Sequence, residues 1–149
     1  MEDYHGAFRA RKQDAVALLP LQGHNVAAFH LGGIAVECRL KALLLLYHRI
    51  QDWDRPSQRR KDAMFNQEVK NPGHSLMTAL KRMPFLYKRA KLDHNFLKHL
   101  QKIIHPFGAT SADYISIRYL PQATLRQNDW QQSFDYVCGW LKKNEGVAL

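Results

Sequence analysis

The chain has 149 residues, of which 46% are apolar and 23% are charged, as is ordinary for a globular protein. We expect one domain, 1–149, whose core needs no disulfide or metal. The two cysteines, Cys38 and Cys138, form no CxxC, which excludes zinc fingers and thioredoxin-like sites and predicts buried, reduced thiols. The N-terminus lacks the apolar core of a signal peptide, and no apolar stretch reaches the roughly 20 residues of a membrane span. We therefore expect a cytoplasmic protein without a membrane segment.

The formal net charge is +9, and the positive excess is concentrated in the middle of the chain. Residues 51–105 contain twelve Lys or Arg and five Asp or Glu, whereas residues 106–149 contain four of each. Clustered cations are the electrostatic footprint of nucleic-acid binding. The alternative is a solvated face that keeps the protein soluble. The cations that we expect to contact nucleic acid are Arg59, Arg60, Lys61, Lys81, Arg82, Lys88, Arg89 and Lys91.

Apolar periodicity predicts two helices in the first part of the chain. The first is expected over 4–19 and ends at Pro20. The second is expected over 25–50 and is apolar around most of its circumference, which is typical of the central helix of a bundle. Gly32 and Gly33 lie inside it, where a glycine costs roughly 1 kcal/mol relative to alanine. We therefore expect another backbone to approach closely there.

A narrow polar stripe runs along this second helix. At 100° per residue, His30, Glu37, Lys41 and His48 lie within about 40° of one another. Glu37 and Lys41 are spaced i, i+4 with the acid first, which favours an ion pair. For the two histidines we expect packing or hydrogen-bonding roles.

Residues 51–73 form a polar and basic segment that we interpret as a mobile insertion after the second helix. We expect it to contain a loop, a short helix over 58–69 and a turn at 71–73.

Three further helices are predicted after this insertion. One begins near Leu76 and ends at Pro84, and the next runs over 93–104 with Asp93 as its N-cap. The last begins near Thr124, where the sequence matches a T-x-x-Q capping box. No alternating strand pattern of useful length occurs. The predicted fold class is therefore all-α, an up-and-down bundle of about five helices with a basic insertion.

Three motifs, in order along residues 10–142, resemble those of the HEPN family of small helical domains. A signature helix with the pattern G-x-A-x-E-x-x-L-K-A-L-L is matched at Gly33, Ala35, Glu37, Leu40, Lys41, Ala42, Leu43 and Leu44. A short H-x-L helix after a loop is matched at His74, Ser75 and Leu76. An aromatic–Arg–Tyr–x–Pro turn before the last helix is matched at Tyr114, Arg118, Tyr119 and Pro121.

This resemblance implies a helical core that often dimerises and an association with RNA or nucleotides in toxin–antitoxin or defence systems. It also implies a frequent partner, a small nucleotidyltransferase. Catalytic HEPN members cut RNA without metal, using an Arg and a His four to six residues further on at the dimer interface. Arg118 matches that arginine by position, but the family's histidine does not follow it. Arg89 and His94 have the spacing but precede the helix over 93–104, where a basic surface loop is the alternative.

Metal-free RNA cleavage needs a base, an acid and a cation for the phosphorane. The candidate catalytic residues are therefore Arg118, Glu37 and His74. Arg118 could instead form an ion pair with a buried Glu37, and His74 could make a hydrogen bond at a helix start. The histidines lack metal-ligand spacing and no glycine-rich phosphate loop is present, so we expect no metal and no cofactor.

We therefore expect a HEPN-like homodimer associated with RNA or nucleotides, either a non-cleaving binding module or a divergent metal-independent ribonuclease. The alternative is a protein-interaction subunit that docks a nucleotidyltransferase or an antitoxin.

Overall fold

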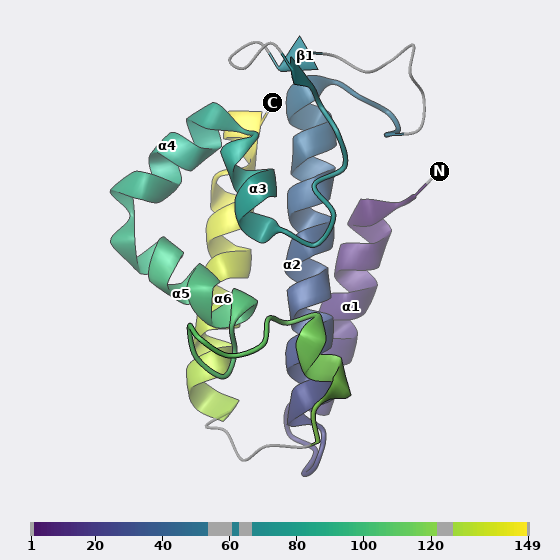
Figure 1. Ribbon diagram of the computed structural model, residues 1–149, viewed down its shortest axis with the longest axis vertical. Helices are drawn as coiled ribbons and strands as arrows, with labels where there is room; N and C mark the ends of the chain where they lie inside the picture. The colour runs from purple at the N-terminus through teal and green to yellow at the C-terminus, as the bar shows by residue number, and fades with distance from the viewer. Residues whose placement is uncertain (1, 54–60, 63–66, 122–126, 149) are drawn as a thin grey trace.

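The computed structural model describes residues 2–53, 61–62, 67–121 and 127–148 (Figure 1). Within these residues the α-helices are α1 (Tyr4–Leu18), α2 (Asn25–His48), α3 (Leu76–Lys81), α4 (Pro84–Leu92), α5 (His94–Ile104) and α6 (Gln127–Lys143). Two short 3₁₀ helices are η2 (Ser116–Tyr119) and η3 (Glu145–Ala148), and two short antiparallel strands are β1 (Lys61–Asp62) and β2 (Gln67–Glu68). The predicted all-α class is confirmed.

Helix α2 is the central element of the fold. It contacts α1, α3, α5 and α6, and Figure 1 shows it upright between α1 on one side and α6 on the other. Its apolar circumference explains this position, because most of its residues are buried against these neighbours. The helix ends two residues earlier than predicted, since Arg49 adopts a left-handed conformation with φ 55° and its N–H caps the carbonyls of Leu45 and Leu46.

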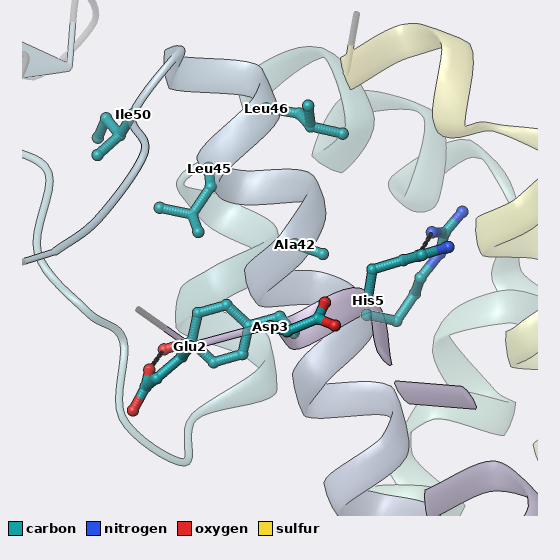
Figure 2. Close-up of a pocket in the computed structure, with 9 residues that line it drawn as sticks. Glu2, Asp3, His5, Ala42, Leu45, Leu46 and Ile50 are labelled. Carbon is teal, nitrogen blue, oxygen red and sulfur yellow. Dashed lines mark hydrogen bonds between the residues drawn. The ribbon is translucent and has the colours of Figure 1, made fainter. Parts of the chain in front are cut away.

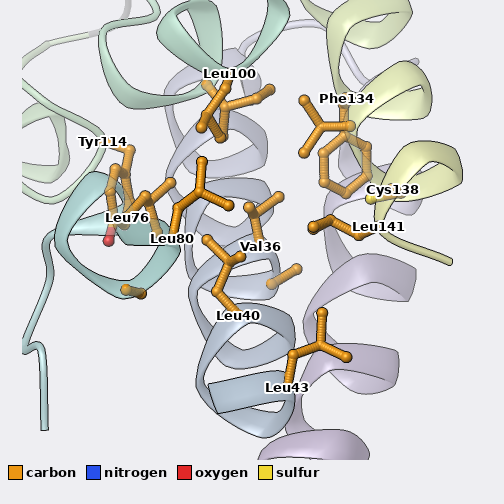
Figure 3. Close-up of a cluster of buried hydrophobic side chains, with 14 of the residues drawn as sticks. Val36, Leu40, Leu43, Leu76, Leu80, Leu100, Tyr114, Phe134, Cys138 and Leu141 are labelled. Atoms are coloured by element: carbon orange, nitrogen blue, oxygen red, sulfur yellow. The ribbon is translucent and has the colours of Figure 1, made fainter. Parts of the chain in front are cut away.

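The core gathers apolar side chains from α2, α3, α5 and α6 around α2 (Figure 3). Burying one leucine or phenylalanine side chain contributes about 1.5–3 kcal/mol relative to leaving it exposed. The side chains labelled in Figure 3 include Val36, Leu40, Leu43, Leu76, Leu80, Leu100, Tyr114, Phe134, Cys138 and Leu141. Tyr114 joins this cluster from the segment before η2 and therefore brings that segment against α2.

The two glycines of α2 make room for aromatic rings rather than for another backbone. A Cβ atom at Gly32 would overlap the indole ring of Trp130, and a Cβ atom at Gly33 would overlap the ring of Tyr114. The expectation of close backbone approach was therefore wrong. The rings of α6 and of the segment before η2 lie directly on the α2 backbone instead.

Two elements differ from the sequence-based predictions. The prediction of a helix over 58–69 was wrong at the residues that the structure describes, because 61–62 and 67–68 pair there as antiparallel strands. Residues 54–60 and 63–66 lie outside the described residues. Helix α4 was not predicted, because Pro84 was taken as the end of a helix. Pro84 instead begins α4, where its missing N–H is not needed and its fixed φ suits the first turn.

The remaining helix boundaries agree closely with the predictions. Helix α1 begins at Tyr4, and α5 has the predicted Asp93 N-cap, whose carboxylate accepts from the Phe96 N–H at 3.1 Å. The predicted start of the last helix at Thr124 lies outside the described residues, and α6 is described from Gln127. None of the described helices is both long and apolar enough to cross a bilayer.

Candidate functional site

The carboxylate of Glu37 is buried in the middle of the bundle, where the residue is 6% exposed, and it accepts three hydrogen bonds. The Lys41 ammonium donates to Oε1 at 2.7 Å, and the Tyr114 hydroxyl donates to Oε2 at 2.6 Å. Nδ1 of His74 lies 3.0 Å from the same Oε2 atom. The predicted ion pair between Glu37 and Lys41 is confirmed, and two groups distant in sequence complete its surroundings.

These partners keep Glu37 ionised. Burial raises the pKa of its carboxyl, but the hydrogen bonds from Lys41, Tyr114 and His74 outweigh burial and hold the pKa below the ordinary 4.5. The pKa of Tyr114 is raised by burial and by its bond to Glu37, so its hydroxyl remains protonated. The cluster is thus a fixed carboxylate surrounded by donors.

His74 is positioned by a turn that the sequence predicted at 71–73. The Gly73 N–H donates to Oδ1 of Asn71 at 2.9 Å, and Gly73 has the left-handed φ of 64° that glycine tolerates. The hydrogen bond at the helix start is made by Ser75, which caps α3 by accepting from the Thr78 N–H. The expectation that His74 makes this bond was therefore wrong. Its imidazole turns to Glu37 and its side chain is 61% exposed.

The imidazole of His74 opens onto a hollow of about 370 Å³, which we name the His74 hollow. It is lined by Pro72, His74, Ser75, Leu76, Met77, Ile104, His105, Asp113 and Tyr114. Nδ1 of His105 lies 3.0 Å from the Ser111 carbonyl oxygen. The sequence reasoning missed His105, Asp113 and Tyr114 as members of this site. An available signal was the acid before the 3₁₀ segment, since Asp113 accepts from the Ser116 N–H at 2.8 Å.

The carboxyl group of Asp113 is ionised within this hollow. Its pKa lies below the ordinary value, chiefly because the backbone N–H of Ser116 donates to it. Its Oδ1 atom also accepts from the N–H of Ile115 at 3.0 Å. The hollow therefore contains one fixed negative charge.

Arg118 lies apart from Glu37 and His74. It is exposed on η2, where its Nη2 atom donates to the Tyr119 hydroxyl at 2.8 Å and its guanidinium lies 4.7 Å from the centre of the Tyr119 ring. Among the described residues no ion pair joins Arg118 to Glu37, so that alternative was wrong. Arg118 also does not line the His74 hollow. The structure thus brings two of the three candidate catalytic residues together.

The two histidines of the α2 stripe have the expected hydrogen-bonding roles. His30 Nδ1 lies 2.7 Å from the Tyr114 carbonyl oxygen, and His48 Nε2 lies 2.7 Å from the Arg82 carbonyl oxygen. Each therefore ties α2 to a neighbouring segment, and neither lines the His74 hollow.

The Arg89 and His94 pair lies on helices rather than on the surface loop that was the alternative. Arg89 is in α4 and its Nη1 atom donates to Oδ1 of Asn144 at 3.0 Å, while His94 is exposed at the first position of α5. Arg89 thus connects α4 to the end of α6.

Helices α3, α4 and α5 carry a basic surface. We apply this name to Lys81, Arg82, Lys88, Arg89, Lys91, Lys98 and Lys102. In the sequence from 70 to 112 the one acidic residue is Asp93, and its carboxylate caps α5 and accepts from the Tyr136 hydroxyl at 2.9 Å. Figure 1 shows α4 and α5 on the side of the bundle away from α1. Of the other predicted nucleic-acid contacts, Arg59 and Arg60 lie outside the described residues, and Lys61 begins β1.

A second hollow of about 410 Å³ lies between the start of α1 and the second half of α2 (Figure 2). Its floor is apolar, and Figure 2 shows carboxylates of Glu2 and Asp3 at its edge. Fixed negative charges disfavour a polyanion there. The hollow contains none of the residues predicted to act in catalysis or in RNA binding.

The described residues contain no group of three or more His, Cys, Asp or Glu side chains that could hold a metal ion. Cys38 and Cys138 are buried and free, as predicted, and burial raises the pKa of the Cys138 thiol to about 11. Comparison of the chain with protein-family models, with curated proteins and with solved structures found no match. The function must therefore be inferred from the chain's own residues.

Proposed function

We propose that this chain is a HEPN-like protein that binds RNA through the basic surface and does not cleave it. The observation that carries the proposal is the run of exposed cations on α3, α4 and α5, where the one acid in the sequence from 70 to 112 is engaged by other groups. Such a surface attracts phosphates over long range, and each neutralised phosphate releases counterions.

The geometry at Glu37 favours binding over cleavage. His74 is fixed by a carboxylate in the way that a general base requires. However, the Arg118 guanidinium is engaged with Tyr119 elsewhere on the surface, and the Lys41 ammonium is buried and paired with Glu37. Among the described residues, neither of these two cations is therefore available to a phosphorane beside His74.

Charge reversal on α4 tests the RNA-binding proposal. We expect Lys88→Glu with Lys91→Glu to lower the affinity for a short single-stranded RNA by about tenfold or more. Two lost phosphate contacts also reduce the slope of log affinity against log salt by about 1.4. Fluorescence anisotropy across a salt series measures both quantities. Arg9→Glu with Arg11→Glu on α1 is the matched control, because it makes the same charge change on the other side of the bundle.

If both double variants lost the same amount of RNA affinity, binding would depend on net charge alone, which would contradict a site on the basic surface. Failure of the wild type to bind any RNA would contradict the proposed function. The same RNA, incubated with the protein in a chelator, is expected to stay intact on a gel. Cleavage that is lost in His74→Ala would instead make the protein a ribonuclease.

A second candidate function is a protein-interaction subunit, which docks a second copy, a nucleotidyltransferase or an antitoxin. The observation that favours it is a pair of exposed apolar side chains on α4, Phe85 at 68% and Leu92 at 79%. They are spaced i, i+7 and so share one face of the helix. Exposed apolar patches on a helix are typical of protein interfaces.

A further inference from the structure

When its two histidines are neutral, the His74 hollow presents hydrogen-bond acceptors and no free donor among its polar side chains. Since the ionised carboxylate of Glu37 only accepts, the proton of a neutral His74 lies on Nδ1 and Nε2 carries a lone pair. The Ser111 carbonyl also only accepts, so the same tautomer holds for His105. Asp113 contributes a carboxylate, which accepts only.

The remaining polar side chains of the lining donate their hydroxyl hydrogens to residues that do not line the hollow. The Ser75 hydroxyl donates to Oγ1 of Thr78 at 2.8 Å, and the Tyr114 hydroxyl donates to Glu37. A ligand that fills this hollow must therefore supply the donors, because an acceptor-rich group such as phosphate would meet lone pairs and a negative charge.

The other walls of the hollow are apolar. They are formed by Pro72, Leu76, Met77 and Ile104. Apolar walls and a volume of about 370 Å³ suit a flat aromatic group whose edge is polar. The chemistry required is thus a planar ring with apolar faces and several N–H donors along one edge.

The basic surface adjoins the hollow at α3. Met77 lines the hollow, and Lys81 lies four residues further along the same face of that helix. The Watson–Crick edge of guanine carries donors at N1 and at the 2-amino group, and single-stranded RNA is read at such edges. An arginine side chain is also planar and rich in donors, but the neighbouring cations repel it and attract RNA phosphates.

We propose that the His74 hollow binds a guanine base of single-stranded RNA whose phosphates lie on the basic surface. This inference rests on the proposed function and adds a base preference to it. The acceptors that meet the guanine edge are Nε2 of His74, Nε2 of His105 and the carboxylate of Asp113.

The test is fluorescence anisotropy of the full chain with uridine-rich RNA that carries one central guanosine, inosine or adenosine. We expect guanosine to bind about tenfold more tightly than adenosine, since a well-placed pair of hydrogen bonds discriminates between bases by this order. Inosine lacks the 2-amino donor and is expected to bind with intermediate affinity.

The decisive variant is Asp113→Asn. The asparagine oxygen can still accept from the N–H groups of Ile115 and Ser116, whereas its amide nitrogen presents a donor in place of an acceptor. We expect the guanosine preference to disappear while the affinity for the adenosine RNA is kept. Asp129→Asn, an exposed position on α6, makes the same charge change and is expected to leave the preference unchanged.

Thermal melting by circular dichroism checks that both variants fold, and the comparison of the three bases on the wild type holds whatever the variants do. Equal wild-type affinity for the three RNAs would overturn the guanine site and leave RNA binding by the basic surface standing. Absence of RNA binding would overturn both proposals. Binding of acetylarginine amide that depends on Asp113, without a guanosine preference, would assign the hollow to a protein side chain and overturn the inference.

Discussion

At the level of single residues, Glu37 and Lys41 depend on each other because both charges are buried. Removing one partner of a buried pair leaves an uncompensated charge and costs about 3–5 kcal/mol, whereas replacing both by apolar residues costs far less. We expect Glu37→Leu to lower the free energy of unfolding by this amount and Glu37→Leu with Lys41→Leu to lower it much less. Urea denaturation measures both, and a loss in the double variant that exceeds the loss in Glu37→Leu would contradict the coupling of the two charges.

The same pair makes stability depend on pH in a defined direction. The folded-state pKa of Glu37 lies below the ordinary 4.5, so the unfolded chain binds its proton first. The contribution of Glu37 is fully present above pH 4.5 and is lost as the pH falls through the lower, folded value. The wild type should therefore lose stability on acidification more steeply than Glu37→Gln. If the free energy of unfolding fell in parallel with pH for the wild type and for Glu37→Gln, Glu37 would not be the source of the acid sensitivity.

The candidate site could be predicted from the sequence only where its contacts are local. The ion pair of Glu37 and Lys41 follows from their spacing of four residues on one helix. The bond between Tyr114 and Glu37 joins residues 77 positions apart, and no periodicity indicates it. Arg118 was predicted to belong to the site because of its position in a sequence motif. In the structure, the 3₁₀ turn of η2 leaves it exposed beside Tyr119.

At the level of helices, close packing decides whether a glycine can be replaced. A methyl group at Gly33 would overlap the Tyr114 ring, and such overpacking costs about 1–3 kcal/mol, more than the roughly 1 kcal/mol that alanine adds to helix propensity. Gly139 in α6 has open space where its Cβ would be. We expect Gly33→Ala to lower the melting temperature and Gly139→Ala to raise it. A rise in both variants would refute the close contact between Tyr114 and α2.

Helices were predicted well where apolar periodicity was strong and poorly where one residue decided the boundary. Helices α2 and α5 follow from their apolar patterns almost to the residue. Helix α4 was missed because a proline can either end a helix or begin one, and the sequence does not distinguish these roles. The pairing of β1 with β2 was not predicted, since two-residue strands have no alternation to detect.

At the level of the whole molecule, the exposed apolar face of α4 is a candidate surface for self-association. Among partners for Phe85 and Leu92, a second copy agrees with the dimer that the HEPN resemblance implies. We expect the wild type to sediment as a dimer and Phe85→Ser with Leu92→Ser to sediment as a monomer. Tyr119→Ser, at an equally exposed position on η2, is the control and should remain dimeric. A monomeric wild type would exclude self-association through α4 and favour a different protein partner.

The central place of α2 also determines how the protein comes apart. Helix α2 contacts α1, α3, α5, α6, η2 and η3. If α2 unfolded, the apolar side chains that these elements pack against it would therefore be exposed to water. Its amide hydrogens should therefore exchange with solvent only when the entire molecule unfolds, in one cooperative event. Helix α1 packs chiefly on α2 and leaves the contacts of α2 with the other helices intact if it detaches. We therefore expect the amide hydrogens of α1 to exchange sooner than those of α2.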